Sequence, residues 1–152
     1  MDLPNIFTPA VSEKVIQRIN ALKPTSQALW GKMTVSQMLA HCNVSYEYLF
    51  ENNHPKPNPF LKFIIKLVAK KAVVSDIPYK KNSPTGPDFK MTTEKDFDIE
   101  KNRLVSYINR VHALGENHFD NKESHSFGKL TTNEWNNMFY KHLDHHLTQF
   151  GV

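Results

Sequence analysis

The feature that most constrains the fold is a pair of helix-starting signals, each followed by apolar residues at helical spacing. Thr34 and Gln37 match the capping box, in which two side chains three residues apart each bond a free backbone N–H at a helix start. Thr131 and Glu134 repeat this pattern. Apolar side chains then recur every three or four residues, which is the spacing of one helix face. We therefore predict amphipathic helices that begin directly after Thr34 and Thr131.

Three further segments show helical periodicity. Helices are predicted after Thr8–Pro9, ending by Pro24, and after Asn58–Pro59, because proline favours the first helical position. Another is expected from about residue 98 to 113, with Gly115 as its C-cap. Strand-like alternation is scarce, so the predicted fold class is all-α, and five helices with irregular connections favour an antiparallel bundle.

Two long segments between these helices lack helical periodicity. We predict that residues 75–91 form an ordered loop, held to the body by Ile77, Tyr79 and Phe89. Loops of this length are uncommon and are often functional, so this one is a candidate lid. Residues 116–129 are predicted to form a polar loop.

Length and composition limit the class of protein. A chain of 152 residues corresponds to a single domain, residues 1–152, that is large enough for its own core. One cysteine excludes a disulfide framework and indicates a reducing compartment. No apolar run reaches the roughly 18 residues of a membrane span, and residues 1–5 do not resemble a secretory signal. These observations predict a soluble cytoplasmic protein.

The positive charge is concentrated in one part of the chain. Residues 56–81 contain seven lysines and one acidic residue, a net charge of +6. Lys62, Lys66 and Lys70 share one helix face beside a very apolar one, which we interpret as a solvated face next to a buried face. Contact with an anionic ligand or an anionic lipid surface is the alternative. The segment has no arginine and no regular aromatic interleaving, so nucleic-acid binding is not expected.

The final helix turns two histidines toward its apolar side. At about 100° per residue, His142 and His146 fall within the apolar arc, His145 falls at its margin and Asp144 faces water. Two neighbouring buried imidazoles cannot both be charged without a large penalty, and a divalent metal uses the lone pairs of both neutral rings. The spacing therefore predicts either two metal ligands or a hydrogen-bonded core pair. The glutamate of the H-E-x-x-H motif is absent, so metalloprotease chemistry is not supported.

His41 is the best candidate for a third ligand. It lies at the border of the apolar stripe on the helix after Thr34, where a side chain can face a cleft between helices. Three protein ligands with open positions are typical of catalytic metal sites, and structural sites usually have four. Cys42 lies on the apolar stripe and is predicted to be a buried, inert thiol. The remaining histidines are predicted to be surface or loop residues: His54, His112, His118 and His125.

Two sequence windows together suggest a family resemblance. The stretch from Trp30 to His41 and the closing stretch from Phe127 to Gly151, with its H-x-x-x-H helix, resemble the DinB-like superfamily of metal-binding bundles. The second window looks like the branch of uncharacterised small bacterial proteins. The resemblance implies an up-down-down-up four-helix bundle with an additional short helix and long loops. It also implies a three-histidine divalent metal site formed by His41, His142 and His146. Gln149 matches a glutamine that commonly follows the second motif, with no role assigned.

The resemblance also implies a range of functions. Relatives include thiol-dependent S-transferases and a mycothiol-dependent isomerase, in which the metal binds the cofactor thiol. We therefore expect zinc or nickel as the metal, a low-molecular-weight thiol as a second cofactor, and a small-molecule substrate that undergoes thiol transfer or hydrolysis. No side chain stands out as a general base. The alternatives are a non-catalytic metal-binding bundle with a stress or sensing role, which forms a homodimer, and a peripheral membrane protein that uses the basic helix.

Overall fold

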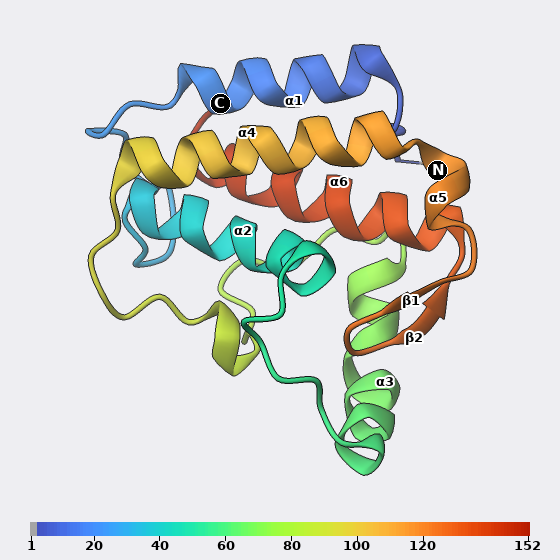
Figure 1. The fold of residues 1–152 in the computed structure, drawn as a ribbon. Coiled ribbons are helices and arrows are strands. Elements are labelled where there is room, and N and C mark those ends of the chain that lie inside the picture. Colours follow the sequence, from blue (N-terminus) through green and yellow to red (C-terminus); the bar gives the residue numbers. More distant parts are fainter. Residues whose placement is uncertain (1–2) are drawn as a thin grey trace.

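The computed structural model describes residues 3–152 and is mostly helical (Figure 1). All five predicted helices are present. Their bounds are α1 Pro9–Ala21, α2 Val35–Phe50, α3 Pro59–Val74, α4 Phe97–Leu114 and α6 Thr132–Gln149. A short 3-10 helix, Pro87–Phe89, interrupts the 75–91 loop, and α5, Glu116–Phe119, follows α4 directly. Met1 and Asp2, on which the prediction about a secretory signal partly rests, lie outside the described residues.

The helix-starting signals act as the sequence predicts. The hydroxyl oxygens of Thr34 and Thr131 accept hydrogen bonds from the backbone N–H groups of Gln37 and Glu134. Both capping boxes are complete, because the Gln37 and Glu134 side chains bond the N-cap backbone in return. Gly115 ends α4 with a positive φ of 72°, a conformation that favours glycine. Local sequence therefore sets the ends of the helices that carry the histidines.

The prediction of a polar loop over residues 116–129 is wrong. Besides α5, this segment forms a hairpin in which β1, Lys122–Ser124, pairs antiparallel with β2, Gly128–Leu130. Ser124 closes the turn, since its hydroxyl donates to the Gly128 carbonyl and accepts from the Phe127 N–H. Strands of three residues are too short to show an alternating pattern in the sequence.

Four long helices, α1, α2, α4 and α6, lie alongside one another and enclose the core (Figure 1). Helix α4 packs on α1 and α2, and α6 packs on α1, α2 and α3. Stacked aromatic rings cross the centre, where the Tyr46 ring centroid lies 5.1 Å from that of Phe139 and 5.6 Å from that of Tyr107. This packing fixes α2 relative to α6, the two helices that carry His41 and the other candidate ligands.

Helix α3 differs from its predicted role. It extends away from the other helices (Figure 1), and of its residues only Val74 is buried. Most of its apolar side chains face solvent, so the interpretation of a buried apolar face is wrong. Two lysines of the predicted solvated stripe are instead half-buried and form ion pairs, Lys62 with Glu123 at 2.6 Å and Lys70 with Glu134 at 2.8 Å. None of the helices within residues 3–152 has both the length and the apolar character that crossing a membrane requires.

Candidate metal centre

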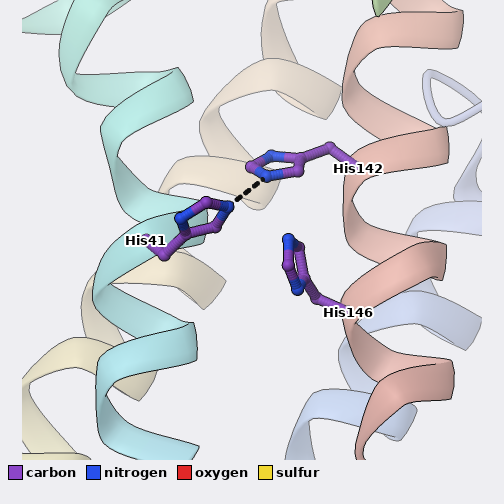
Figure 2. A group of neighbouring side chains, drawn as sticks. All are labelled: His41, His142 and His146. Carbon is purple, nitrogen blue, oxygen red and sulfur yellow. Dashed lines mark hydrogen bonds between the residues drawn. The ribbon is translucent and has the colours of Figure 1, made fainter. Parts of the chain in front are cut away.

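The structure brings the three predicted ligand residues together. His41 comes from α2, and His142 and His146 come from successive turns of α6, with all three rings pointing toward one another (Figure 2). The Nε2 atoms of His41 and His142 are 2.9 Å apart, and one ring nitrogen from each histidine lies within 4.8 Å of the other two. Two ligands of a tetrahedral zinc ion stand about 3.3 Å apart, because each lies about 2.0–2.1 Å from the metal. The donors therefore converge at the scale of a metal site.

Each ring is held in place through its second nitrogen, Nδ1. The Nδ1–H of His41 donates to the Phe89 carbonyl at 2.8 Å, and that of His146 donates to Oε1 of Gln149 at 2.8 Å. Nδ1 of His142 lies 3.1 Å from the Ser45 hydroxyl. Occupied Nδ1 atoms leave the Nε2 lone pairs of His41 and His146 directed into the cluster, the arrangement that orients histidine ligands in metalloproteins.

Gln149 thus has a role that the sequence did not reveal. While its Oε1 accepts from His146, its Nε2 donates to the Trp30 carbonyl at 2.7 Å, so one side chain ties the end of α6 to the segment before α2. Gly31 makes this approach possible. It has a φ of +84°, and a Cβ at this position would lie 2.6 Å from the Gln149 Nε2.

Burial keeps the three histidines neutral. His41 and His146 are buried, at 5% and 8% exposure, and burial lowers the pKa of His41 and takes that of His146 to about 3. Burial also lowers the pKa of His142 well below its usual value, and the nearby His146 and His41 lower it further. Neutral imidazoles with free lone pairs are the form that binds a metal ion.

The hydrogen bonds among the protein's own described groups do not occupy every nitrogen of the three rings. Without a metal, His142 Nε2–H donates to His41 Nε2, and the Ser45 hydroxyl then donates to His142 Nδ1. Within residues 3–152, that pattern gives Nε2 of His146 no hydrogen-bond partner. A cation at the centre would use all three Nε2 lone pairs at once, and Ser45 can accept from His142 instead of donating. The donor set therefore fits a divalent ion that prefers nitrogen ligands.

The 75–91 loop forms one wall of the cluster. The Phe89 ring centroid lies 5.2 Å from that of His41 and 5.9 Å from that of His142, and the Tyr79 centroid lies 6.5 Å from that of His142. These contacts confirm that Tyr79 and Phe89 hold the loop to the body. Ile77, however, is exposed, so its predicted part in holding the loop is wrong. His145 packs on Tyr79 beside the cluster without joining it.

A second polar network lies near the first and was not predicted. Arg103 of α4 donates to Glu47 of α2 at 2.6 Å, and the other carboxylate oxygen of Glu47 lies 2.7 Å from Nε2 of His54. Tyr48 stacks on His125 with ring centroids 3.9 Å apart. His54 and His125 do lie in loops, as predicted, but both are partly buried, and they contact Glu47 and Tyr48 respectively. No local motif indicates this network, because its members come from distant segments.

The other predicted residues are placed as follows. His118 is exposed, and His112 is partly buried and donates from Nδ1 to the Phe7 carbonyl at 2.9 Å. Cys42 is buried, as predicted, and burial raises the pKa of its thiol, which favours the predicted inert character.

Fold and site together define a mostly helical protein with a buried cluster of three histidines that can hold a metal ion. The model of one protein family, described as "Protein of unknown function (DUF1569)", matches residues 8–151, and the chain therefore belongs to this family. Comparison with curated proteins and with solved structures found no match. The resemblance to the DinB-like superfamily stays a prediction.

Proposed function

We propose that this protein is a divalent-metal-dependent enzyme whose metal is held by His41, His142 and His146. The observation that carries the proposal is that the two nitrogens of each ring have different surroundings. The Nδ1 atoms bond Phe89, Ser45 and Gln149, while the opposite sides of the rings converge on one point. A hydrogen-bonded core pair needs neither a third histidine from another helix nor three separate supports.

We further propose that the fold is an up-down-down-up four-helix bundle of the DinB-like type. The support comes from the order and direction of the long helices. In Figure 1, α1 and α6 run in one direction and α2 and α4 in the other. The two sequence windows that carry the resemblance also contain the ligands, with His41 ending the first and His142 and His146 in the second.

The chemistry follows from a neutral three-nitrogen donor set. Zinc or nickel bound there acts as a Lewis acid and lowers the pKa of a bound water or thiol toward neutrality. The protein's own residues hold the rings in the required tautomer and exclude water on the side covered by Phe89 and Tyr79. Transfer of a low-molecular-weight thiol to a small electrophile is the favoured reaction, with hydrolysis as the second choice. The 75–91 loop, which carries both aromatic rings, would serve as the lid.

One observation favours a non-catalytic metal site as the second candidate function. Within residues 3–152, no Asp or Glu side chain hydrogen-bonds any of the three ligand rings. Acid–base catalysis ordinarily places a titratable group within hydrogen-bond reach of the substrate. A bundle that binds metal in a stress or sensing role needs no such group.

Metal analysis tests the site itself. Untagged protein purified without chelator is expected to contain about one zinc or nickel ion per chain, and His142→Ala and His146→Ala are expected to lose it. His118→Ala, which removes an exposed histidine, is the matched control and should retain the ion. Equal metal content in all four proteins, or none in the wild type after incubation with either ion, would reject the proposal.

Cobalt substitution separates an enzyme from a passive site. Adding a low-molecular-weight thiol to the cobalt-loaded protein is expected to shift the visible absorption, because a sulfur ligand changes the ligand field. A panel of electrophiles then tests for turnover. An unchanged spectrum together with no turnover would favour the non-catalytic metal site.

A further inference from the structure

Helix α3 presents a continuous apolar surface to solvent. Phe60 is 76% exposed, Leu67 66% and Val68 75%. At about 100° per residue these positions fall on one side of the helix, opposite the Ile65, Ala69 and Val73 side that is less exposed. Three more exposed apolar residues complete the surface: Leu61, Phe63 and Ile64. An exposed apolar area of this kind marks a contact surface.

The charged side chains of the segment that forms this helix are all positive. Residues 52–75 contain five lysines and no aspartate or glutamate. Lys62 and Lys70 pair with Glu123 and Glu134 of other elements. Lys66 and Lys71 have no ion-pair partner anywhere in residues 3–152. The exposed helix therefore combines an apolar side with unpaired positive charge.

A groove beside α3 is lined by both apolar and positively charged side chains. Its volume is about 660 Å³, and the apolar side chains of Phe63, Leu67 and Val74 line it next to three lysines, Lys66, Lys70 and Lys71. Glu134, the ion-pair partner of Lys70, also lines it and leaves a net positive charge. A phospholipid with an anionic headgroup matches such a lining, since its phosphate suits the ammonium groups and its acyl chains suit the apolar side.

We propose that α3 docks this protein on the surface of an anionic lipid bilayer. The helix would lie in the plane of the headgroups, with Phe60, Leu67 and Val68 inserted among the upper acyl carbons. The long, flexible side chains of Lys66 and Lys71 would extend their ammonium groups to the phosphates. Amphipathic helices bind membranes in this way through buried apolar area and attraction to anionic lipids. Helix α3 projects away from the other long helices (Figure 1), and its apolar side chains are exposed, which makes this side accessible to a flat surface.

Charge argues against a second copy of the chain as the occupant. A two-fold symmetric contact places the same patch on both partners. Two α3 helices would then bring ten lysines of residues 52–75 into one interface, with no acidic residue from either segment to offset them. An anionic bilayer supplies the opposite charge instead.

Vesicle co-sedimentation of the full chain tests the proposal. The protein is expected to sediment with vesicles of equal parts phosphatidylcholine and phosphatidylglycerol, and to remain in solution with phosphatidylcholine alone. Lys66→Gln/Lys71→Gln should weaken binding to the anionic vesicles roughly 30-fold, since each lysine near the surface contributes about 1 kcal/mol. Phe60→Ser/Leu67→Ser should weaken it at least as much.

Matched controls come from elsewhere on the surface. Lys14→Gln and Ile99→Ser remove an exposed lysine of α1 and an exposed apolar residue of α4, and both should bind like the wild type. Circular dichroism checks that each variant folds. Absence of binding to anionic vesicles, or equal losses in the controls, would overturn the proposal. So would a wild-type dimer in sedimentation equilibrium that Phe60→Ser/Leu67→Ser converts to a monomer, because a second copy would then cover the surface.

Discussion

On α6, histidines occupy positions that ordinarily hold apolar side chains, whereas on α3, apolar side chains occupy positions that face water. His146 is 8% exposed and Phe60 is 76% exposed, the reverse of what their chemistry favours in a protein without ligands. The histidines are anchored through Phe89, Ser45 and Gln149, and α3 is anchored mainly through α6.

The difference between the two regions indicates which kind of ligand each would bind. A buried polar cluster in which every ring has its own support indicates a small ligand that enters a prepared site. An exposed apolar helix with little support indicates a large partner that covers it. Because the two exceptions to ordinary burial differ in kind, we expect the two regions to respond differently to mutation, metal and pH.

The largest expected contrast is in folding stability. Phe139→Ala removes a ring at the centre of the aromatic core and is expected to lower the free energy of unfolding by about 3–5 kcal/mol. Phe60→Ala on α3 should change it by less than about 0.5 kcal/mol, because the ring is exposed. Urea denaturation of dilute protein measures both values. A loss of several kcal/mol for Phe60→Ala would show that the exposed side of α3 is packed in solution.

Metal should stabilise the folded protein through the histidine cluster, and this gain should not depend on the exposed side of α3. Zinc at one hundred times its dissociation constant is expected to raise the free energy of unfolding by about 2.7 kcal/mol, since only the folded state assembles the three ligands. His142→Ala should abolish this gain, and Phe60→Ala should retain it in full. Unfolding followed with and without zinc provides the measurement. A gain that survives in His142→Ala would place the ion elsewhere.

Replacing a residue that orients a candidate ligand ring should weaken metal binding less than replacing the ligand itself. Gln149→Leu removes the acceptor for His146 Nδ1 and is expected to weaken metal binding about 10- to 100-fold. Competition with a chelating dye measures the affinity. Gln17→Leu, at an exposed position of α1, is the matched control and should keep the wild-type affinity. Equal affinities for the two variants would mean that the Gln149 contact does not orient the ring.

The effect that is smallest near neutral pH, and that grows on acidification, concerns the stability of the metal-free protein. The pKa of His146 in the folded state is about 3, lowered by burial from 6.5, so the unfolded state binds more protons between these values. Stability from this histidine is complete above about pH 6.5 and is lost as the pH falls toward 3. The loss approaches about 1.4 kcal/mol per pH unit below pH 6. Urea denaturation of chelator-treated wild type and His146→Leu measures it, and parallel pH profiles would contradict the assignment.

Local signals predicted the helices well. The capping boxes at Thr34 and Thr131 and the C-cap at Gly115 depend on residues within four positions of one another, so they can be recognised in a linear sequence. The same is true of His142 and His146, which share a face because they lie one helical turn apart. The hairpin after α5 was missed because its strands are too short for a periodic pattern.

The sequence predicted the three histidines of the candidate site but not the residues that hold them. The border position of His41 on a predicted helix makes it a candidate ligand, and the family resemblance supports this prediction. The supports could not be predicted, because the Phe89 carbonyl belongs to an irregular loop and backbone carbonyls carry no sequence signal. The role of Gln149 depends equally on the Trp30 carbonyl, 119 residues away in the chain.

The amino-acid sequence by itself determined the helical character, the helix starts and the pairing of two histidines on one face of α6. These properties arise from interactions between residues that are close along the chain. Tertiary structure alone decided that the His41 ring meets the other two, that Ser45, Phe89 and Gln149 hold the cluster, and that α3 leaves its apolar side exposed. The physical reason is that these outcomes depend on the packing of segments far apart in sequence, which no local pattern encodes.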